Sequence, residues 1–140
     1  MSKVAVVYWS ASGSTQTMAE EVAAGASEKG AEVQIFDAAA FRAEMVPDYD
    51  GIAFGCPAMG AEQLESSEFE PMFDSVEPAL SGKPIALFGS YGWGDGTWMR
   101  DWEDRCRADG AVLASESVIA NYAPGEEEKS ACRALGAALA

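Results

Sequence analysis

The sequence predicts an α/β fold, a doubly wound five-stranded parallel sheet with helices on both faces. Two observations lead to this prediction. Short apolar runs rich in β-branched residues recur along the chain, and stretches with helical spacing of apolar residues separate them. Runs that are apolar at every position are typical of strands buried on both faces, and strands that alternate with helices form parallel sheets with right-handed crossovers.

The elements can be placed in chain order. The first strand is expected at residues 3–9, an almost unbroken apolar run. Met18, Val22 and Ala26 then recur at helical spacing until Gly30 ends the first helix. Further strands are expected at 31–36, 51–56, 84–89 and 111–114, the last of which either ends there or resumes at 117–119. Further helices are expected at 67–79, 96–109 and 126–139. No linker or repeat interrupts this alternation, so residues 1–140 are expected to form a single domain.

The composition excludes several kinds of chemistry. The chain has no histidine, which removes the commonest general base and every Ser-His or Cys-His catalytic pair. Its three cysteines, Cys56, Cys106 and Cys132, form no CxxC pair, so neither a zinc site nor a four-thiolate iron–sulfur cluster is expected. We therefore expect no metal and no catalytic residues, and we expect the thiols to be buried and reduced.

The charge balance limits the partners. The chain carries 23 acidic and 9 basic residues, a formal net charge of −14. Such a surface repels nucleic acid and anionic lipid, and it steers association with basic partners. No secretory signal and no membrane-length apolar run is visible, so a cytoplasmic protein is expected.

Ligands of open α/β sheets bind outside the carboxyl ends of the strands. The loop after the first strand, at 10–15, contains four hydroxyl side chains and a glycine and opens a helix. Free N–H groups and the helix dipole make it a candidate phosphate site, although a serine-rich helix cap would look the same. It lacks the lysine of the triphosphate-binding loop, so hydrogen bonds alone would hold the phosphate. We expect no basic residue beside it.

Two more loops at this edge have unusual compositions. After the third strand, Met59 offers a thioether to an aromatic ring, Gly60 permits an unusual turn, and Glu62 offers an acceptor to a ligand N–H. After the fourth strand, Tyr91 and Trp93 stand among three glycines, a pattern that brings backbone and an aromatic face to a ligand. An ordinary turn and a partly exposed tryptophan are the alternatives. Together the three loops suit a flat heteroaromatic ligand that carries a phosphate.

At these loops the sequence resembles the flavodoxins, specifically the short-chain type of anaerobic bacteria, and the resemblance runs nearly end to end. It rests on the run Val7-Tyr-Trp-Ser10, the hydroxyl pattern at 10–15, Ala58-Met59-Gly60, Ser67-Glu-Phe-Glu-Pro71 and the long run from Ala86 to Gly96. The resemblance implies a flavodoxin-like sheet with strand order 2-1-3-4-5 and one non-covalently bound flavin mononucleotide (FMN).

The resemblance also implies roles for individual residues. One face of the flavin would stack on Trp93 and the other on Met59, Glu62 would accept from the flavin N3–H, and the backbone near Gly92 would meet the pyrimidine edge. The full set of cofactor-binding residues implied in this way is Ser10, Ala11, Ser12, Gly13, Ser14, Thr15, Pro57, Ala58, Met59, Gly60, Ala61, Glu62, Ser90, Tyr91, Gly92, Trp93 and Gly94. Whether Asn121 or Tyr122 touches the flavin stays open.

One position departs from the family pattern. The carbonyl of Gly60 would rotate toward flavin N5 on one-electron reduction, and family members usually have Asp, Asn or Gly at the next position, where this chain has Ala61. A left-handed conformation at Ala61 would cost roughly 1–2 kcal/mol. Ala61→Gly is therefore expected to stabilise the semiquinone, and an unchanged semiquinone yield in a reductive titration would refute this.

The charges suggest a mechanism. Full reduction leaves negative charge on the flavin, and the surrounding acids and the phosphate would oppose it. We expect a low-potential one-electron carrier that shuttles between semiquinone and hydroquinone, not an enzyme. Carboxylates in or beside the flavin loops would form an acidic rim for redox partners with basic docking patches, and the chain would be a monomer. These carboxylates are Glu62, Glu65, Glu68, Glu70, Asp95, Asp101, Glu103 and Asp104. The alternative is that they are solvated helix ends without a docking role. The alternative to the carrier is a flavin-dependent NAD(P)H or quinone reductase, for which the chain has little spare length.

Overall fold

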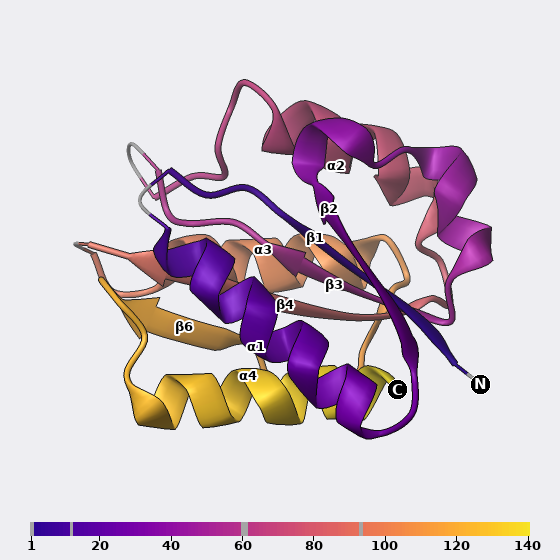
Figure 1. The fold of residues 1–140 in the computed structure, drawn as a ribbon. Coiled ribbons are helices and arrows are strands. Elements are labelled where there is room, and N and C mark those ends of the chain that lie inside the picture. Colours follow the sequence, from indigo (N-terminus) through magenta and orange to yellow (C-terminus); the bar gives the residue numbers. More distant parts are fainter. Residues whose placement is uncertain (1, 12, 60–61, 93) are drawn as a thin grey trace.

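A computed structural model describes residues 2–11, 13–59, 62–92 and 94–140. Its sheet is parallel, with strand order β2-β1-β3-β4-β5, and an additional strand, β6, pairs with β4 (Figure 1). The predicted fold class and strand order are confirmed. The strands are β1 (Lys3–Tyr8), β2 (Glu32–Asp37), β3 (Gly51–Gly55), β4 (Pro84–Tyr91), β5 (Val112–Leu113) and β6 (Val118–Asn121).

The fifth strand of the prediction is divided into two short pieces. β5 pairs only with the start of β4, where Val112 lies opposite Pro84. β6 then pairs with the end of β4, from Val118 opposite Phe88 to Asn121 opposite Tyr91. The open alternative, a strand that resumes after 114, is therefore the one observed, and it extends the sheet edge to Asn121.

The helices follow the predicted spacing closely. They are α1 (Ser14–Glu28), α2 (Phe69–Val76), α3 (Thr97–Ala108) and α4 (Glu126–Leu139), with short 3₁₀ turns η1 (Ala38–Ala40), η2 (Ala43–Asp48) and η3 (Glu77–Ala79). The expected helix at 67–79 is shorter as an α-helix. Pro78, in η3, has no N–H to donate, so the chain leaves the α-helical pattern at Val76.

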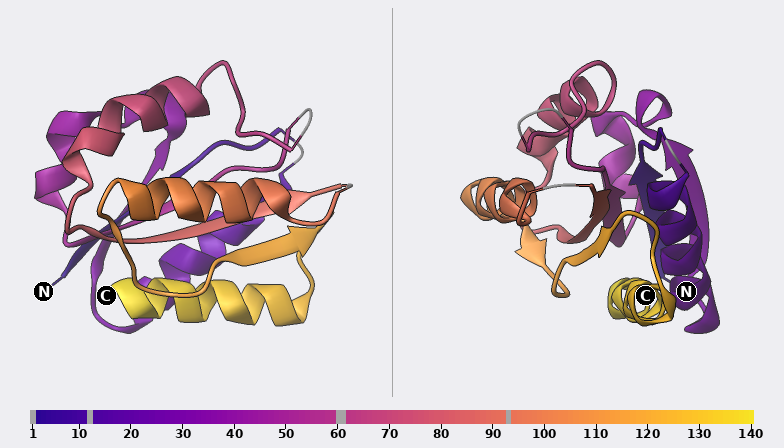
Figure 2. Two further views of the ribbon diagram at one scale, coloured as in Figure 1. Left: turned by 180° about the vertical axis from the view of Figure 1, so that it is seen from behind. Right: turned by 90° about the vertical axis from the view of Figure 1, so that its left-hand side faces the viewer.

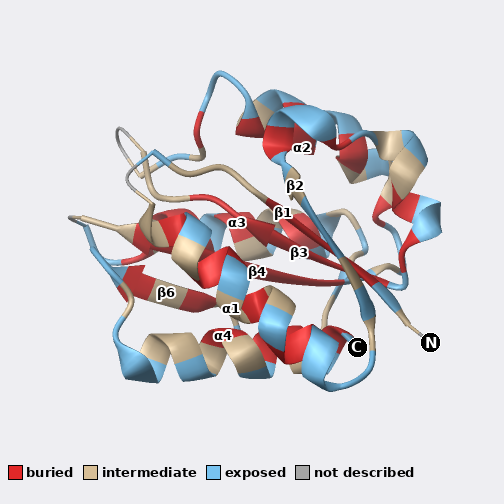
Figure 3. Cartoon of the chain, in the orientation of Figure 1, coloured by how far each residue is buried: buried red, intermediate tan, exposed pale blue. Residues whose placement is uncertain are grey.

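Two apolar cores lie on opposite faces of the sheet. Alternate residues of β1 point to opposite faces, with Ala5 and Val7 in the core under α2 and α3 and Val4 and Val6 in the core under α1 and α4. The four side chains are fully buried, which is why the run is apolar at every position. Figure 2 shows one helix pair on each side of the sheet, and Figure 3 shows the buried strands β1, β3 and β4 between them.

The carboxyl ends of the central strands lie side by side at one edge. Tyr8 pairs with Gly55, Gly55 with Phe88, and Tyr91 with Asn121. In Figure 1 this edge is at the left, opposite both chain termini. The loops that leave β1, β3, β4 and β6 therefore meet there.

The three cysteines are free and buried, as predicted, and burial is the main cause that raises the pKa of each thiol to about 12. Within the described residues no cluster of potential ligands could hold a metal ion. Nor does any helix in this part of the chain have the length and apolar character needed to cross a membrane.

Candidate functional site

The loop that leaves β1 forms the first wall of the site. Ser10 Oγ accepts the backbone N–H of Gly13 at 3.1 Å, which bends the loop toward the start of α1. Gly13 has φ +94°, a left-handed conformation that a glycine adopts without strain, and a Cβ built on it would meet nothing within 4 Å. The first turn of α1 contains no acidic residue. This end of the helix therefore offers N–H groups and hydroxyls to an anion.

One hydrogen bond ties this wall to the centre of the sheet, and a second ties the loop after β3 to the same residue of β4. Thr15 is 1% exposed, and its hydroxyl lies 3.0 Å from the hydroxyl of Ser90 near the end of β4. Ser90 O also accepts the N–H of Ala58 at 2.9 Å. The loops after β1, β3 and β4 are thus joined through one short segment of β4.

The loop that leaves β3 contains a closed turn. Met59 and Gln63 exchange two backbone hydrogen bonds of 2.8 Å each, so the loop closes on itself between these two residues. Glu62 is in this turn with φ 53°, and its carboxylate lies against Gly94, where a Cβ would be 2.3 Å from Oε1. Oε1 is buried and has no hydrogen-bond partner among the described residues. A buried carboxylate oxygen without a donor is costly and suits a ligand N–H.

A hollow of about 440 Å³ lies between these loops. Nine of the predicted cofactor-binding residues line it, together with two that the sequence did not assign, Tyr122 and Ala123. The nine are Ala11, Ser14, Thr15, Pro57, Ala58, Met59, Ser90, Tyr91 and Gly92. The structure thus brings hydroxyls, a thioether, an aromatic ring and exposed backbone to one cavity, in the size range of cofactor sites.

Of the other eight predicted residues, four belong to the described part of the chain, and none of these four lines this hollow. Glu62 lines a separate, smaller hollow with Trp98 and Trp102, and Gly94, which is exposed, lies against the Glu62 carboxylate. Gly13 lines a neighbouring hollow with Ser14, while Ser10 braces the loop. Four predicted residues lie outside the described part of the chain, namely Ser12, Gly60, Ala61 and Trp93.

Tyr122 is the residue that sequence reasoning left open. Its N–H donates to Tyr91 O at 2.7 Å, and its ring packs against Gly92, where a Cβ would be 3.4 Å from the ring. It has φ 60° and is 67% exposed, although it is a large aromatic residue. The register of β6 against β4 places it there, and the local sequence does not reveal that register.

The expected acidic rim is only partly observed. Glu65 is buried, 5% exposed, and it caps α2. The prediction that it belongs to an exposed acidic rim is therefore wrong. Glu70 is engaged with Arg105, and Glu103 accepts the hydroxyl of Ser117. The acids of this set that remain exposed are Glu68, Asp95, Asp101 and Asp104. Three of them also have partners: Glu68 accepts the indole N–H of Trp9, Asp95 pairs with Arg100, and Asp104 pairs with Arg107.

The fold and this hollow define a class of protein: a doubly wound α/β protein with a cavity of about 440 Å³ at the carboxyl ends of its strands. A family model described as "Flavodoxin" matches residues 6–136. The chain is 42% identical to a flavodoxin of Clostridium beijerinckii over 135 residues, 96% of this chain and 97% of that protein. It is 41% identical to a flavodoxin of Megasphaera elsdenii, over 98% of each chain.

Solved structures agree. The solution structure of two-electron reduced Megasphaera elsdenii flavodoxin matches with a TM-score of 0.90 and 41% identity, covering 97% of both chains. A flavodoxin from the domain Archaea matches with a TM-score of 0.85 and 27% identity, covering 98% of this chain and 95% of that one. The chain belongs to the flavodoxin family. It is an FMN flavoprotein of electron transport, a redox carrier that works with partner proteins.

Proposed function

We propose that the hollow at the carboxyl ends of β1, β3 and β4 is the FMN site and that the chain is a low-potential one-electron carrier. When bound, FMN supplies the redox chemistry, accepting and donating single electrons. The observation that carries the proposal is the convergence of three loops on one cavity. The loop that brings Met59 to this cavity also carries Glu62, whose buried Oε1 has no hydrogen-bond partner among the described residues. Each wall of this cavity has a chemistry that suits one part of the cofactor.

Different groups of the protein would bind different parts of FMN. The hydroxyls and N–H groups at the start of α1 would hold the phosphate, and Met59 would pack on the ring system. Glu62 would accept a ring N–H and so gain the donor that it lacks among the described residues. Ser12, Gly60, Ala61 and Trp93 keep the roles predicted for them from the resemblance, as part of this proposal.

The low potential follows from charge. A carboxylate ~10 Å from the reduced ring, at an effective dielectric of about 40, costs about 0.8 kcal/mol before salt screening. Asp101 is exposed on α3 and lines the small hollow beside Glu62, so it is placed to act in this way. The carrier would therefore work between its one-electron-reduced and fully reduced states.

Stepwise anaerobic reduction followed by visible absorption tests the carrier function. We expect flavin absorption that passes through the long-wavelength band of the neutral one-electron-reduced flavin before it bleaches. A direct conversion to the two-electron form, with NADH turnover by the pure protein, would instead favour the reductase. Asp101→Asn should raise the potential of the second step by on the order of 20 mV, whereas Glu28→Gln, at the far end of α1, should not.

The exposed acids also suggest how partners dock. We propose that the monomeric chain presents Glu68, Asp95 and Asp101 to basic patches on its redox partners. The electron-transfer rate to a basic acceptor protein should then fall steeply as ionic strength rises. A rate that is independent of salt, or a dimer in sedimentation, would contradict this part of the proposal.

A further inference from the structure

We propose that Lys129 supplies the positive charge for the FMN phosphate, an inference that rests on the proposed site at the start of α1. The sequence indicates a phosphate held by hydrogen bonds alone, because the loop at 10–15 contains no basic residue. The structure changes this expectation. It brings a lysine from α4, more than a hundred residues along the chain, to the same place.

The position of Lys129 is defined by a second hollow. This hollow, of about 400 Å³, is lined by Gly13, Ser14 and Thr17 at the start of α1 and by Ala123, Pro124 and Lys129 opposite them. It adjoins the proposed flavin cavity, because Ser14 and Ala123 line both. A phosphate at the N-terminal end of α1 would therefore lie between the hydroxyl groups and the lysine.

Close packing of α1 against α4 holds the lysine there. A Cβ added to Gly25 would be 1.9 Å from Arg133 O, and one added to Gly136 would be 1.9 Å from Val22 O, so only glycine allows this approach. The two helices run in the same direction (Figure 1). Arg133 pairs with Glu21 across them. One turn earlier on each helix stand Lys129 and Thr17, which is why both reach the same hollow.

The charges around Lys129 favour an anionic ligand. The side chain is half-buried, and none of the ion pairs among the described residues includes it. The first turn of its own helix contains three acids, of which Glu126 and Glu127 are exposed and Glu128 accepts the N–H of Gly125. On the facing helix, the first turn of α1 contains no acid at all. In a chain of net charge −14, this corner combines a helix N-terminus with an unpaired lysine.

The test compares two ligands that differ only in the phosphate. FMN and riboflavin are titrated into the apoprotein, and binding is measured by the loss of flavin fluorescence. Lys129→Gln should weaken FMN binding about three-fold and Lys129→Glu about ten-fold, while riboflavin binding stays unchanged. Lys129→Arg should bind FMN as the parent chain does. Lys29→Gln removes the same charge at the opposite end of α1, and it should change neither ligand.

Salt gives a second measurement. The FMN affinity of the parent chain should fall as salt is raised to about 0.5 M, and that of Lys129→Gln should fall less. If Lys129→Gln loses affinity for FMN and riboflavin equally, Lys129 only supports the position of α4, and the proposal is wrong. If Lys129→Gln binds FMN with the affinity and the salt dependence of the parent chain, the proposal is also overturned. A parent chain that binds no FMN would instead overturn the proposed function.

Discussion

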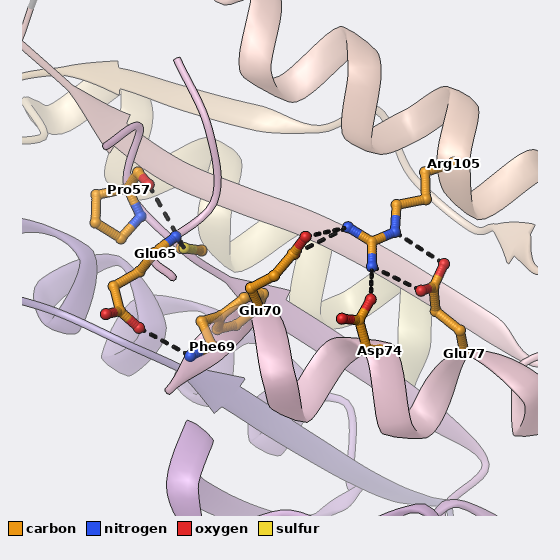
Figure 4. A network of polar contacts seen from close by, with 8 residues as sticks. Pro57, Glu65, Phe69, Glu70, Asp74, Glu77 and Arg105 are labelled. Carbon is orange, nitrogen blue, oxygen red and sulfur yellow. Dashed lines mark hydrogen bonds and ion pairs between the residues drawn. The ribbon is translucent and has the colours of Figure 1, made fainter. Parts of the chain in front are cut away.

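The carboxylate of Glu65 accepts the backbone N–H of Phe69 at 2.8 Å and so closes the N-terminal end of α2 (Figure 4). The same carboxylate accepts the N–H groups of Ser67 and Glu68, also at 2.8 Å. The N–H of Glu65 in turn donates to Cys56 Sγ at 3.3 Å, next to the end of β3. One buried residue therefore fixes both ends of the segment that leaves β3 and carries Met59 and Glu62.

Glu65→Gln is expected to lower the free energy of unfolding by about 2 kcal/mol at pH 7, because the amide NH₂ would face donors where the carboxylate accepts. Burial raises the pKa of Glu65, but the hydrogen bonds from Ser67, Phe69 and Glu68 outweigh it and lower the pKa to about 2. A lowered pKa stabilises the fold above the ordinary carboxyl range, and this contribution is lost as pH falls from about 4.5 through 2. Urea unfolding measures the free energy of unfolding at pH 7 and at pH 3. The difference between these two values should be smaller in Glu65→Gln than in the parent chain. If exposed Glu28→Gln costs as much, the cap is not the cause.

Gly136→Ala should destabilise the protein by about 2–3 kcal/mol, although alanine is the better helix former by about 1 kcal/mol. The added Cβ would meet Val22 O at 1.9 Å, and backbone cannot move aside as a side chain can. Gly125→Ala, at the start of the same helix, is the matched control, since its Cβ meets only the flexible end of Glu128 at 3.1 Å. Thermal unfolding of the two variants checks this. Equal stability would show that α1 and α4 can separate without cost.

Features of the fold that depend on residues close together in the sequence could be predicted. Short runs rich in apolar and β-branched residues predicted the strands. Because parallel strands end at one edge, the three loops could be expected to meet there. Contacts made by packing were not predictable in this way. Gly25 and Gly136 look like weak points of helices until α1 and α4 are placed together. Glu65 looks like one more surface acid in a chain of 23 acidic residues, and only its position under the start of α2 reveals a cap.

Asp109→Asn is expected to stabilise the fold by about 1–2 kcal/mol at pH 8 and to have little effect at pH 4. Burial, and then the hydrogen bond and charge of Glu77, raise the pKa of Asp109 to about 6. A carboxyl whose pKa is raised in the folded state loses stability as pH rises from its ordinary value of 3.8 through 6. The amide removes the charge and can still donate to Glu77.

Urea unfolding at several pH values measures this effect. Figure 4 shows Glu77 already paired with Arg105 on α3, so Glu77 retains its positive partner in the variant. Asp104→Asn, an exposed acid one turn away that pairs with Arg107, should shift stability by less than about 0.5 kcal/mol at any pH. A gain at pH 4 as large as that at pH 8 would disprove the assignment of the effect to Asp109 ionisation.

Tyr122 should contribute to flavin binding through its ring, which packs on Gly92 at the wall of the proposed site. Tyr122→Ala and Tyr122→Gly should each weaken FMN and riboflavin about equally, by roughly five-fold, because the ring and not a charge is lost. Tyr122→Phe should bind both ligands as the parent chain does. The fluorescence titration that tests Lys129 measures these affinities, and the two residues should differ clearly, since only Lys129 distinguishes the phosphate.

The backbone at Tyr122 permits a second, independent measurement. Its φ of 60° is a left-handed conformation that strains alanine but not glycine, so apo Tyr122→Gly should be more stable than apo Tyr122→Ala by about 1 kcal/mol. A more stable glycine variant would show that the backbone at position 122 is left-handed. If both variants nevertheless bind flavin as tightly as the parent chain, the tyrosine ring has no role in binding. If the glycine variant is no more stable, the turn after β6 relaxes without its tyrosine. In that case a loss of affinity in either variant would reflect a changed loop, not a missing contact.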